Sequence, residues 1–225
     1  IDLRQDGDMA DKLEEILGNL IEEEKLGFLT ILDKEGHVIL RAHALTKKDD
    51  NLSGERAVAT ALFEGESFVT IESSPAEKLS IRAASPVIIE EEVSGAIVVG
   101  FPLDNPFVDS IKRITGLQMS VFEGNTRVAT TILNPDGRTR SIDIKQVDSR
   151  VSQTVLKEGG NITLRTEVLS RPFLASYLPL KNSDGKIVGM ISAARSQREI
   201  LEIAQATNRL TLVVVMIIML TLITP

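Results

Sequence analysis

The sequence predicts an α+β protein in which two similar modules follow one another. Three observations predict this class. Apolar residues in the first 27 positions have helical spacing, after which the pattern changes to short β-rich runs separated by turns. The same order of runs returns roughly 90 residues later, a length typical of a small domain rather than of a solenoid repeat. Because the runs are joined as hairpins, each module is expected to contain an antiparallel sheet.

The composition is that of a globular chain with no nucleic-acid surface. Hydrophobic residues make up 43% of the 225 residues, which is enough to bury a core and argues against disorder. The net charge is −7, and Lys and Arg are scattered without a basic block, so a nucleic-acid partner is excluded. There is no cysteine, which excludes disulfides and thiolate metal sites.

A long amphipathic helix is predicted over residues 1–27, followed by a first module over 28–104. The helix carries its apolar residues on one stripe and ends near Gly27. The turn Asp33–Gly36 joins a hairpin, and Gly65 ends a short helix. The first module is expected to comprise strands 28–32 and 37–43, a helix over 55–63, and strands 67–73, 79–85 and 94–101.

The second module, predicted over 105–195, repeats this order. Asn105-Pro106 begins a helix, since proline suits a first helical turn, and Gly116 ends it. Residues 57–65 match 151–159 in pattern, including the final glycine. The remaining expected elements are strands 117–123 and 127–133, a helix over 147–156, and strands 161–168, 172–178 and 186–194.

The last segment, 196–225, predicts a helix that enters a membrane. Ser196 and Glu199 form a capping box, and an uncharged apolar run, 210–224, follows Arg209. This run would cover roughly 22 Å of a hydrocarbon core about 30 Å thick, so we expect the chain to be part of a longer membrane protein. A buried core helix is the alternative for so short a run.

Motifs in both halves resemble a known sensor family. The second half carries them most clearly, and the first half follows more loosely through 33–36, 82–86 and 95–100. The chain is similar in these motifs to the double-Cache, PAS-like extracytoplasmic domains of bacterial and archaeal chemoreceptors and sensor kinases. One departure is Ser141-Ile142, where the family often has Gly-Thr. The second-half motifs are 107–116, 126–131, Asp136-Gly137, 176–180 and 184–190.

The resemblance implies a membrane-distal first module that binds a ligand and a membrane-proximal second module. It also implies a periplasmic or extracellular location for this region of a cell-membrane protein, a homodimer through the long helices, and signalling parts in the cytoplasm. The chain has no tryptophan and a single tyrosine, so the aromatic cage of amino-acid-binding members is absent. An organic acid is therefore a more suitable ligand than a standard amino acid.

Polar residues on the strands of the first module form a candidate ligand site. Strand alternation places His37, Ile39, Arg41 and His43 on one face. A guanidinium can grip a carboxylate through two hydrogen bonds, so such a set suits a small polar or anionic ligand. The alternative is a solvated sheet face with a weak Glu72–Arg82 pair. The candidate residues are Arg41, His43, Arg56, Thr70, Glu72, Ser80 and Arg82.

An equivalent pocket in the second module would contain Arg127, Thr131, Ser176 and Tyr177. The alternative for Tyr177 is that its ring packs in the core and its hydroxyl is hydrogen-bonded. No cofactor and no metal are expected. The chain has two histidines, and Lys47–Asn51 lacks the ligand spacing of an EF-hand loop.

The function predicted from these features is ligand sensing by the extracytoplasmic region of a transmembrane receptor. An enzyme is not expected, because the chain has no phosphate-binding Gly-rich loop with Lys, no Gly-x-Ser-x-Gly and no His-Glu-x-x-His. The alternative is a membrane-anchored adhesion or scaffold module without a small-molecule ligand. The cytoplasmic output, whether a chemotaxis hub, a kinase of a two-component system or a cyclase, stays open.

Overall fold

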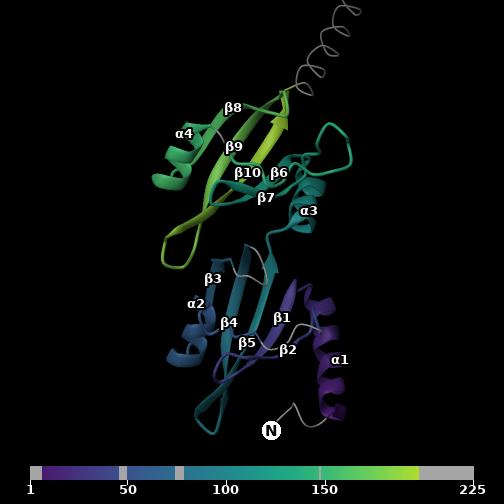
Figure 1. Cartoon of the computed structure of the whole chain (residues 1–225), viewed down its shortest axis with the longest axis vertical. Coiled ribbons are helices and arrows are strands. Elements are labelled where there is room, and N and C mark those ends of the chain that lie inside the picture. Colours follow the sequence, from purple (N-terminus) through teal and green to yellow (C-terminus); the bar gives the residue numbers. More distant parts are fainter. Residues whose placement is uncertain (1–6, 46–49, 74–78, 147, 198–225) are drawn as a thin grey trace, which may run out of the picture. The chain divides into compact units, whose positions relative to one another are not determined.

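Two five-stranded antiparallel sheets dominate the computed structural model, which describes residues 7–45, 50–73, 79–146 and 148–197 (Figure 1). The strand orders are β2-β1-β5-β4-β3 and β7-β6-β10-β9-β8, so the same topology occurs twice. The predicted α+β class with repeated antiparallel sheets is confirmed. The chain divides into two compact units between residues 107 and 108, and the segment 180–189 groups with the first unit.

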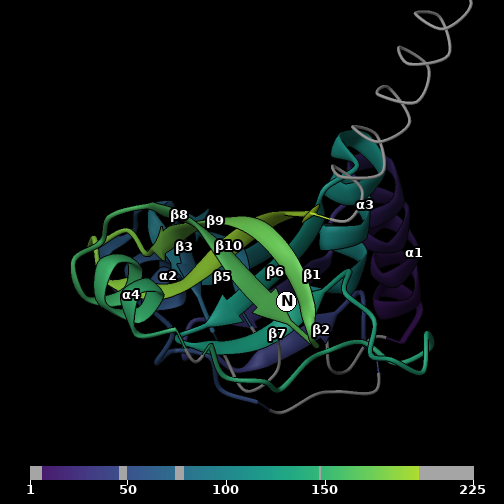
Figure 2. The same ribbon diagram turned by 90° about the horizontal axis from the view of Figure 1, so that it is seen from above.

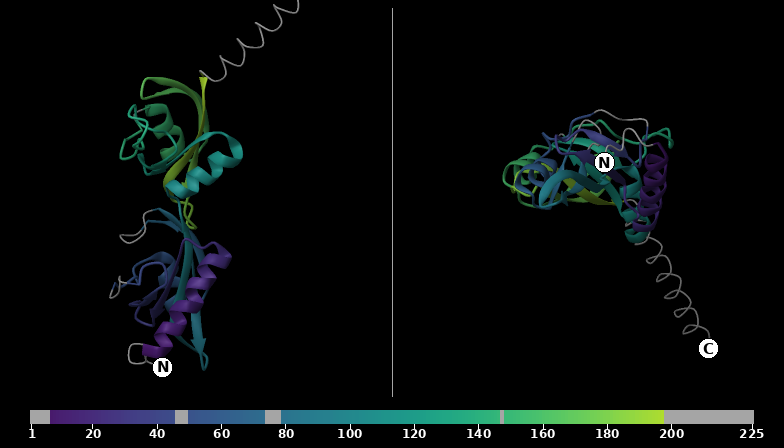
Figure 3. Two further views of the ribbon diagram at one scale, coloured as in Figure 1. Left: turned by 90° about the vertical axis from the view of Figure 1, so that its right-hand side faces the viewer. Right: turned by 90° about the horizontal axis from the view of Figure 1, so that it is seen from below.

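The first unit begins with helix α1 (Gly7–Glu24), which packs on the outer face of the first sheet. Leu13, Leu17 and Ile21 on this helix contact Leu29 and Leu40 on the strands below. These residues recur every three or four positions, so burial of one helical stripe holds the helix on the sheet. Figure 3 shows α1 lying against one face of the sheet.

The other elements of the first unit follow the predicted order. Its second helical segment is the least regular, because α2 continues into a π-helical turn, η1, before Gly65 ends it in the left-handed region at φ 72°. The elements are β1 (Phe28–Asp33), β2 (Val38–Arg41), α2 (Arg56–Ala59), η1 (Thr60–Glu64), β3 (Phe68–Glu72), β4 (Ser80–Ile89) and β5 (Glu92–Pro102).

The core of the first unit lies between its sheet and the α2–η1 segment. Ala57 and Val58 are fully buried and pack with Phe28, Leu32 and other apolar side chains of the inner sheet face. This face is opposite the one that α1 covers, since Leu32 and Leu29 differ by an odd number of positions along one strand. The site described below lies on the inner face.

A bulge in β2 corrects the predicted alternation of that strand. Thr30 pairs with Arg41 and Leu32 with Val38, so the four residues 38–41 of β2 lie opposite the three residues 30–32 of β1. Arg41 and Val38 consequently share the inner face, and both are buried. The predicted single face of alternating residues 37, 39, 41 and 43 is wrong because alternation holds only where pairing is unbroken.

Strand β4 extends beyond the predicted end at residue 85 and includes Pro86. Pairing with β3 stops at Ala84, opposite Phe68, so beyond that point β4 has only β5 as a neighbour. On such a free edge the missing N–H of proline removes no ladder hydrogen bond. The long β4–β5 hairpin therefore tolerates Pro86.

The second unit repeats these elements around its own core. Met190, Val151 and Val155 are fully buried there and pack with Phe122 and Tyr177. The helices α3 and α4 lie on opposite sides of the second sheet (Figure 2). The elements are α3 (Asn105–Thr115), β6 (Gln118–Glu123), β7 (Thr126–Thr130), α4 (Ser149–Val151), the π-helical η2 (Ser152–Lys157), β8 (Ile162–Val168), β9 (Arg171–Lys181) and β10 (Ile187–Ser196).

Most of the predicted exit helix, 196–225, lies outside the described residues, as do residues 1–6 of the predicted N-terminal helix. Ser196 is the last residue of β10. Within the described ranges, no helix combines the length and the apolar character needed to cross a membrane.

Candidate functional site

The candidate site of the first unit is centred on Arg82, which is 1% exposed and lies on β4, between β5 and β3. Its Nη1 donates to Glu55 Oε2, and its Nε lies 4.0 Å from Glu72 Oε1. Its guanidinium carbon lies 5.3 Å from the centre of the Phe28 ring. A buried guanidinium is costly unless it is paired, and here two carboxylates and an aromatic ring surround it.

The two carboxylates come from segments that meet at the start of α2. Glu55 immediately precedes this helix, and Glu72 is the last residue of β3. Glu72 Oε2 accepts a hydrogen bond of 3.2 Å from the backbone N–H of Arg56, one of the donors that a helix start leaves unsatisfied. Arg82 therefore joins the helix, β3 and β4 at one point.

A second buried arginine lies near this centre. Arg41 is 1% exposed, and its Nη1 donates to Asp50 Oδ2 at 2.8 Å. Burial, and secondly the positive charge of Arg41, lower the pKa of Arg82 to about 10. Burial also raises the pKa of Glu72, against the opposing effect of hydrogen bonds from the backbone of Arg56 and Ala57. The cluster is thus a set of charged groups held away from water.

The structure brings four of the predicted ligand residues together: Arg41, Glu72, Ser80 and Arg82. Ser80 pairs with Glu72 across the strands, and its hydroxyl lies 3.5 Å from Arg82 Nη2. Arg41, Ser80 and Arg82 are each at most 1% exposed, so the alternative of a solvated sheet face is wrong.

The other three predicted residues have different surroundings. Thr70 is buried opposite Arg82, and its hydroxyl oxygen accepts from the N–H and the hydroxyl of Ser183 at 3.2 Å. The ring of His43 lies 5.7 Å from the ring of Phe28. The side chain of Arg56 is exposed and lies over the ring of Phe68, while its backbone N–H donates to Glu72.

Sequence reasoning missed Glu55 and Asp50. Glu55 is the first residue of the helix predicted over 55–63, and in the structure it lies immediately before α2. Among the described residues, no group hydrogen-bonds to two buried acceptor atoms of the cluster, Glu55 Oε1 and Glu72 Oε1. Buried acceptors of this kind are costly unless a donor reaches them.

In the second unit, the structure brings together two of the four predicted pocket residues. Arg127 is 6% exposed and lies 5.2 Å above the ring of Phe122, while its Nη1 donates to the backbone oxygen and the hydroxyl of Ser141 at 3.2 and 3.1 Å. The Tyr177 ring lies 6.3 Å from that of Phe122, and its hydroxyl accepts from Gln146 Nε2 at 2.8 Å.

Thr131 and Ser176, the other two predicted residues, have different hydrogen-bond partners. The hydroxyl of Thr131 accepts from the N–H of Met119 and donates to Gln118. The hydroxyl of Ser176 pairs at 2.7 Å with that of Thr163 on the exposed outer face of the sheet. Adjacent residues of one strand point to opposite faces, so Ser176 and Tyr177 cannot line one pocket.

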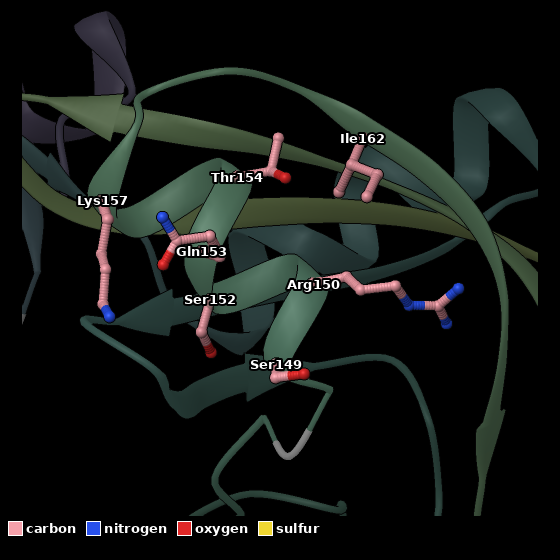
Figure 4. Close-up of a pocket in the computed structure, with 7 residues that line it drawn as sticks. All are labelled: Ser149, Arg150, Ser152, Gln153, Thr154, Lys157 and Ile162. Atoms are coloured by element: carbon pink, nitrogen blue, oxygen red, sulfur yellow. The ribbon is translucent and has the colours of Figure 1, made fainter.

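An open groove of about 630 Å³ lies on the outer side of α4 and η2 (Figure 4). The charged ends of Arg150 and Lys157 point away from each other, and Arg150 is held by a 2.8 Å ion pair with Asp148. The groove therefore has no converging charge. Its lining residues are Ser149, Arg150, Ser152, Gln153, Thr154, Lys157 and Ile162.

The described part of the chain contains no group of three or more His, Cys, Asp or Glu side chains that could hold a metal ion.

Residues 99–207 match the family model described as single Cache domain 3. This stretch is just under half of the chain, and the match agrees with the predicted resemblance to Cache domains. No curated protein matches the sequence significantly.

Solved structures of extracellular ligand-binding domains share the fold. The extracellular domain of the histidine kinase rpHK1S-Z16 has a TM-score of 0.52 at 12% identity, over 84% of this chain and 78% of that one. The ligand-binding domain of Campylobacter jejuni chemoreceptor Tlp3, in complex with L-norvaline, has a TM-score of 0.50 at 15% identity. This match covers 88% of this chain and 76% of that one.

An extracellular ligand binding receptor from Desulfohalobium retbaense gives a TM-score of 0.50 at 12% identity. The match covers 80% of this chain but 32% of that receptor. At such identities these likenesses show the fold alone.

Proposed function

We propose that this chain is the ligand-sensing region of a transmembrane receptor and that its first unit binds a small polar molecule beside Arg82. The observation that supports this most directly is the buried cluster of Arg82, Glu55 and Glu72, which joins a helix to two strands. Structural ion pairs are usually exposed, and buried charge with perturbed pKa values is typical of functional sites.

The ligand class follows from the groups in this cluster. One carboxylate oxygen of each glutamate, Oε1 of Glu55 and of Glu72, is buried without a hydrogen-bond donor among the described residues. These two oxygens suit the hydroxyl or amino groups of a ligand. The guanidinium of Arg41 or Arg82 suits a carboxylate. A small organic acid that also carries hydroxyl or amino groups satisfies both requirements.

Binding would act on the segments that Arg82 joins. A ligand that competes for Glu55 or Glu72 alters how the start of α2 is held on β3 and β4, and so favours one of two pre-existing conformations. Strand β5 pairs with β4 along its length and leads directly into α3 of the second unit. We propose that the signal continues through residues 196–225 into a cell membrane, from a periplasmic or extracellular side, in a homodimer.

The test is a thermal-shift screen of organic acids, amines and nucleobases with the purified chain. A ligand that binds only the folded state raises the melting temperature by mass action. The affinity of a hit should fall on the order of 10- to 100-fold in Arg82→Met and Glu72→Gln, because each removes a charged hydrogen-bonding group. Arg56→Met is the matched control, since Arg56 is exposed and outside the cluster.

Unchanged affinity in both cluster variants would place the ligand elsewhere. A chain that no small molecule stabilises would favour the adhesion or scaffold function instead. The relay has its own test in the complete receptor. Two residues inserted near Gln205 should rotate a continuous helix by about 200° and disturb output, and a normal response would contradict the relay.

A further inference from the structure

The turn between β9 and β10, residues 182–185, makes a long-range contact with strand β3. Residues 180–189 group with the first compact unit, although β9 and β10 pair with each other in the second sheet. The N–H and the hydroxyl of Ser183 both donate to the hydroxyl oxygen of Thr70, each at 3.2 Å. The turn is therefore held by a residue of the strand that carries part of the proposed ligand site.

Thr70 lies on the same sheet face as the ligand cluster. It is paired with Arg82 on β4 and precedes Glu72 by two positions on β3, so the three side chains point to the inner face. Thr70 is 5% exposed even though β3 is an edge strand. A hydroxyl that accepts from Ser183 is thus carried by the strand face that also presents the carboxylate of Glu72.

The position of β3 depends on a small number of attachments. As an edge strand it pairs with β4 alone. Its last residue, Glu72, accepts from the backbone N–H of Arg56 at 3.2 Å and lies 4.0 Å from Arg82 Nε. A ligand that binds Glu72 or Arg82 would change these attachments, and the end of β3 would move together with Thr70.

The turn is fixed internally and leads directly into β10. Asn182 Oδ1 accepts from the N–H groups of Asp184 and Lys186 at 3.1 and 2.8 Å. Gly185 has a φ of 77°, a left-handed conformation that glycine adopts without steric cost. Strand β10 begins two residues later and ends at Ser196. A turn that keeps its shape passes a displacement to the strand that follows it.

The corresponding turn of the first unit is different. The repeated strand orders match the β4–β5 hairpin with the β9–β10 hairpin, so Glu90 and Glu91 correspond to the turn 182–185. Both glutamates are exposed and have left-handed φ values of 51° and 68°. The two modules share their order of elements, so the contact between Ser183 and Thr70 is a feature that the second hairpin has in addition.

We infer that the turn 182–185 is a latch on the ligand site of the first unit. Engagement of Ser183 with Thr70 depends on the state of the cluster around Arg82, and β10 carries the change towards Ser196. The inference rests on the proposed function for the ligand that acts on the cluster. Because coupling is reciprocal, engagement of the latch and binding of that ligand change each other by the same factor.

Disulfide formation measures engagement of the latch without any ligand. The chain has no cysteine, so Thr70→Cys/Ser183→Cys in the purified 225-residue chain places the only two thiols at the contact. Oxidised glutathione forms a mixed disulfide with the exposed thiol at position 183 and releases one reduced glutathione. The thiol at position 70 then displaces the second glutathione. The rate of this second step reports how often the two positions meet.

Glu72→Ala, added to this pair, should slow crosslinking at least about fivefold, the lower end of usual coupling between sites. The reason is that it removes the attachment of β3 to the N–H of Arg56. Glu66→Ala is the matched control, because Glu66 is exposed and precedes β3. Thr163→Cys/Ser176→Cys is the control pair, since its parent hydroxyls lie 2.7 Å apart on β8 and β9. The rate of this pair should not respond to Glu72→Ala.

Three results would overturn the inference. The first is a Thr70→Cys/Ser183→Cys chain that does not crosslink. The second is a crosslinking rate that Glu72→Ala leaves unchanged. The third is equal slowing of the control pair, which would show general loosening of the chain. A thermal-shift screen without a hit would count against the proposed function, whereas unchanged crosslinking alongside a confirmed ligand would reject the latch alone.

A second measurement applies if the double-cysteine chain does not fold. A fluorescent label on Ser183→Cys should change its emission when Glu72→Ala is added. The same label on Pro135→Cys should not, because Pro135 is exposed in the turn 134–137, which has the same Asn-x-Asp-Gly pattern. Equal responses of the two labels would overturn the inference as well.

Discussion

Glu55 and Arg82 form an ion pair that connects the residue before α2 to the first half of β4. Their side chains are 12% and 1% exposed, so the pair is largely removed from water. It fixes the start of the helix relative to the sheet at the place where the proposed ligand would bind. Because the pair is buried, removal of one member has a larger effect than removal of an exposed ion pair.

Replacement of Glu55 with Gln should destabilise the first unit strongly. The substitution leaves the guanidinium of Arg82 buried with only the more distant Glu72 as a negative partner. We expect the free energy of unfolding to fall by up to about 3–5 kcal/mol, measured by urea denaturation.

Glu64→Gln on the same helical segment is the matched control, because Glu64 is exposed and its replacement should cost less than about 0.5 kcal/mol. The double variant Glu55→Gln/Arg82→Met should recover part of the loss, since it removes the buried guanidinium that Glu55→Gln leaves without its nearer carboxylate. If Glu55→Gln and Glu64→Gln were equally stable, the structural role of the Glu55–Arg82 pair would be contradicted.

The raised pKa of Glu72 predicts a pH effect of defined sign. Burial makes the folded state hold this proton more tightly than the unfolded state. The stabilisation from protonation is therefore complete below the ordinary glutamate pKa of about 4.3 and is lost as the pH rises through the raised pKa of the folded state.

Glu72→Gln tests this effect, because glutamine keeps an oxygen for the N–H of Arg56 and removes the ionisation. The stability of the parent relative to this variant should fall as the pH rises from about 4 towards neutrality. Urea denaturation of both proteins across this range measures the difference. A difference that grows with pH would show that Glu72 is stabilised in its charged form.

Local patterns predicted the α+β fold well, because they depend on neighbours in sequence. Helical periodicity located α1, and turn signals located the hairpins. Strand alternation alone does not determine which face Arg41 lies on. The bulge in β2, seen in its pairing with β1, places Arg41 on the inner face. Glu55 and Asp50 were missed because their partners are 27 and 9 residues away, and only the folded sheet brings them together.

The ion pair between Arg140 and Asp109 should stabilise the second unit less than the Glu55–Arg82 pair stabilises the first, and this stabilisation should depend on salt. Two hydrogen bonds of 2.9 and 2.7 Å join their side chains and attach the segment after β7 to α3. The hydrogen bond from Arg140 is the main reason that the pKa of Asp109 lies below its ordinary value. The resulting stability is present above the ordinary aspartate pKa and is lost as the pH falls through the lowered value.

Asp109→Asn should therefore cost less than about 1 kcal/mol at neutral pH, because the side chains are 38% and 29% exposed and solvent screens the pair. The cost should shrink in high salt and at acid pH. Asp184→Asn in an exposed turn is the control. A cost that salt and acid leave unchanged would indicate a role in packing instead of charge pairing.

Gly100 should be intolerant of substitution because it lies between Phe28 and Arg82. In the sheet, Gly100 is paired with Phe28 on one side and with Arg82 on the other. A methyl group at this position would overlap the carbonyl oxygen of Ile81 and the ring of Phe28. The absence of a side chain here lets the guanidinium lie over the aromatic ring.

Gly100→Ala should lower the free energy of unfolding by about 1–3 kcal/mol, as overpacking of a core does. Gly18→Ala is the opposite control, since no atom lies within 4 Å of the added methyl group and alanine favours a helix by about 0.5–1 kcal/mol. Urea denaturation measures both. If Gly100→Ala folds and keeps its stability, the stacking of Arg82 on Phe28 cannot depend on this glycine, and ligand affinity should then also be unchanged.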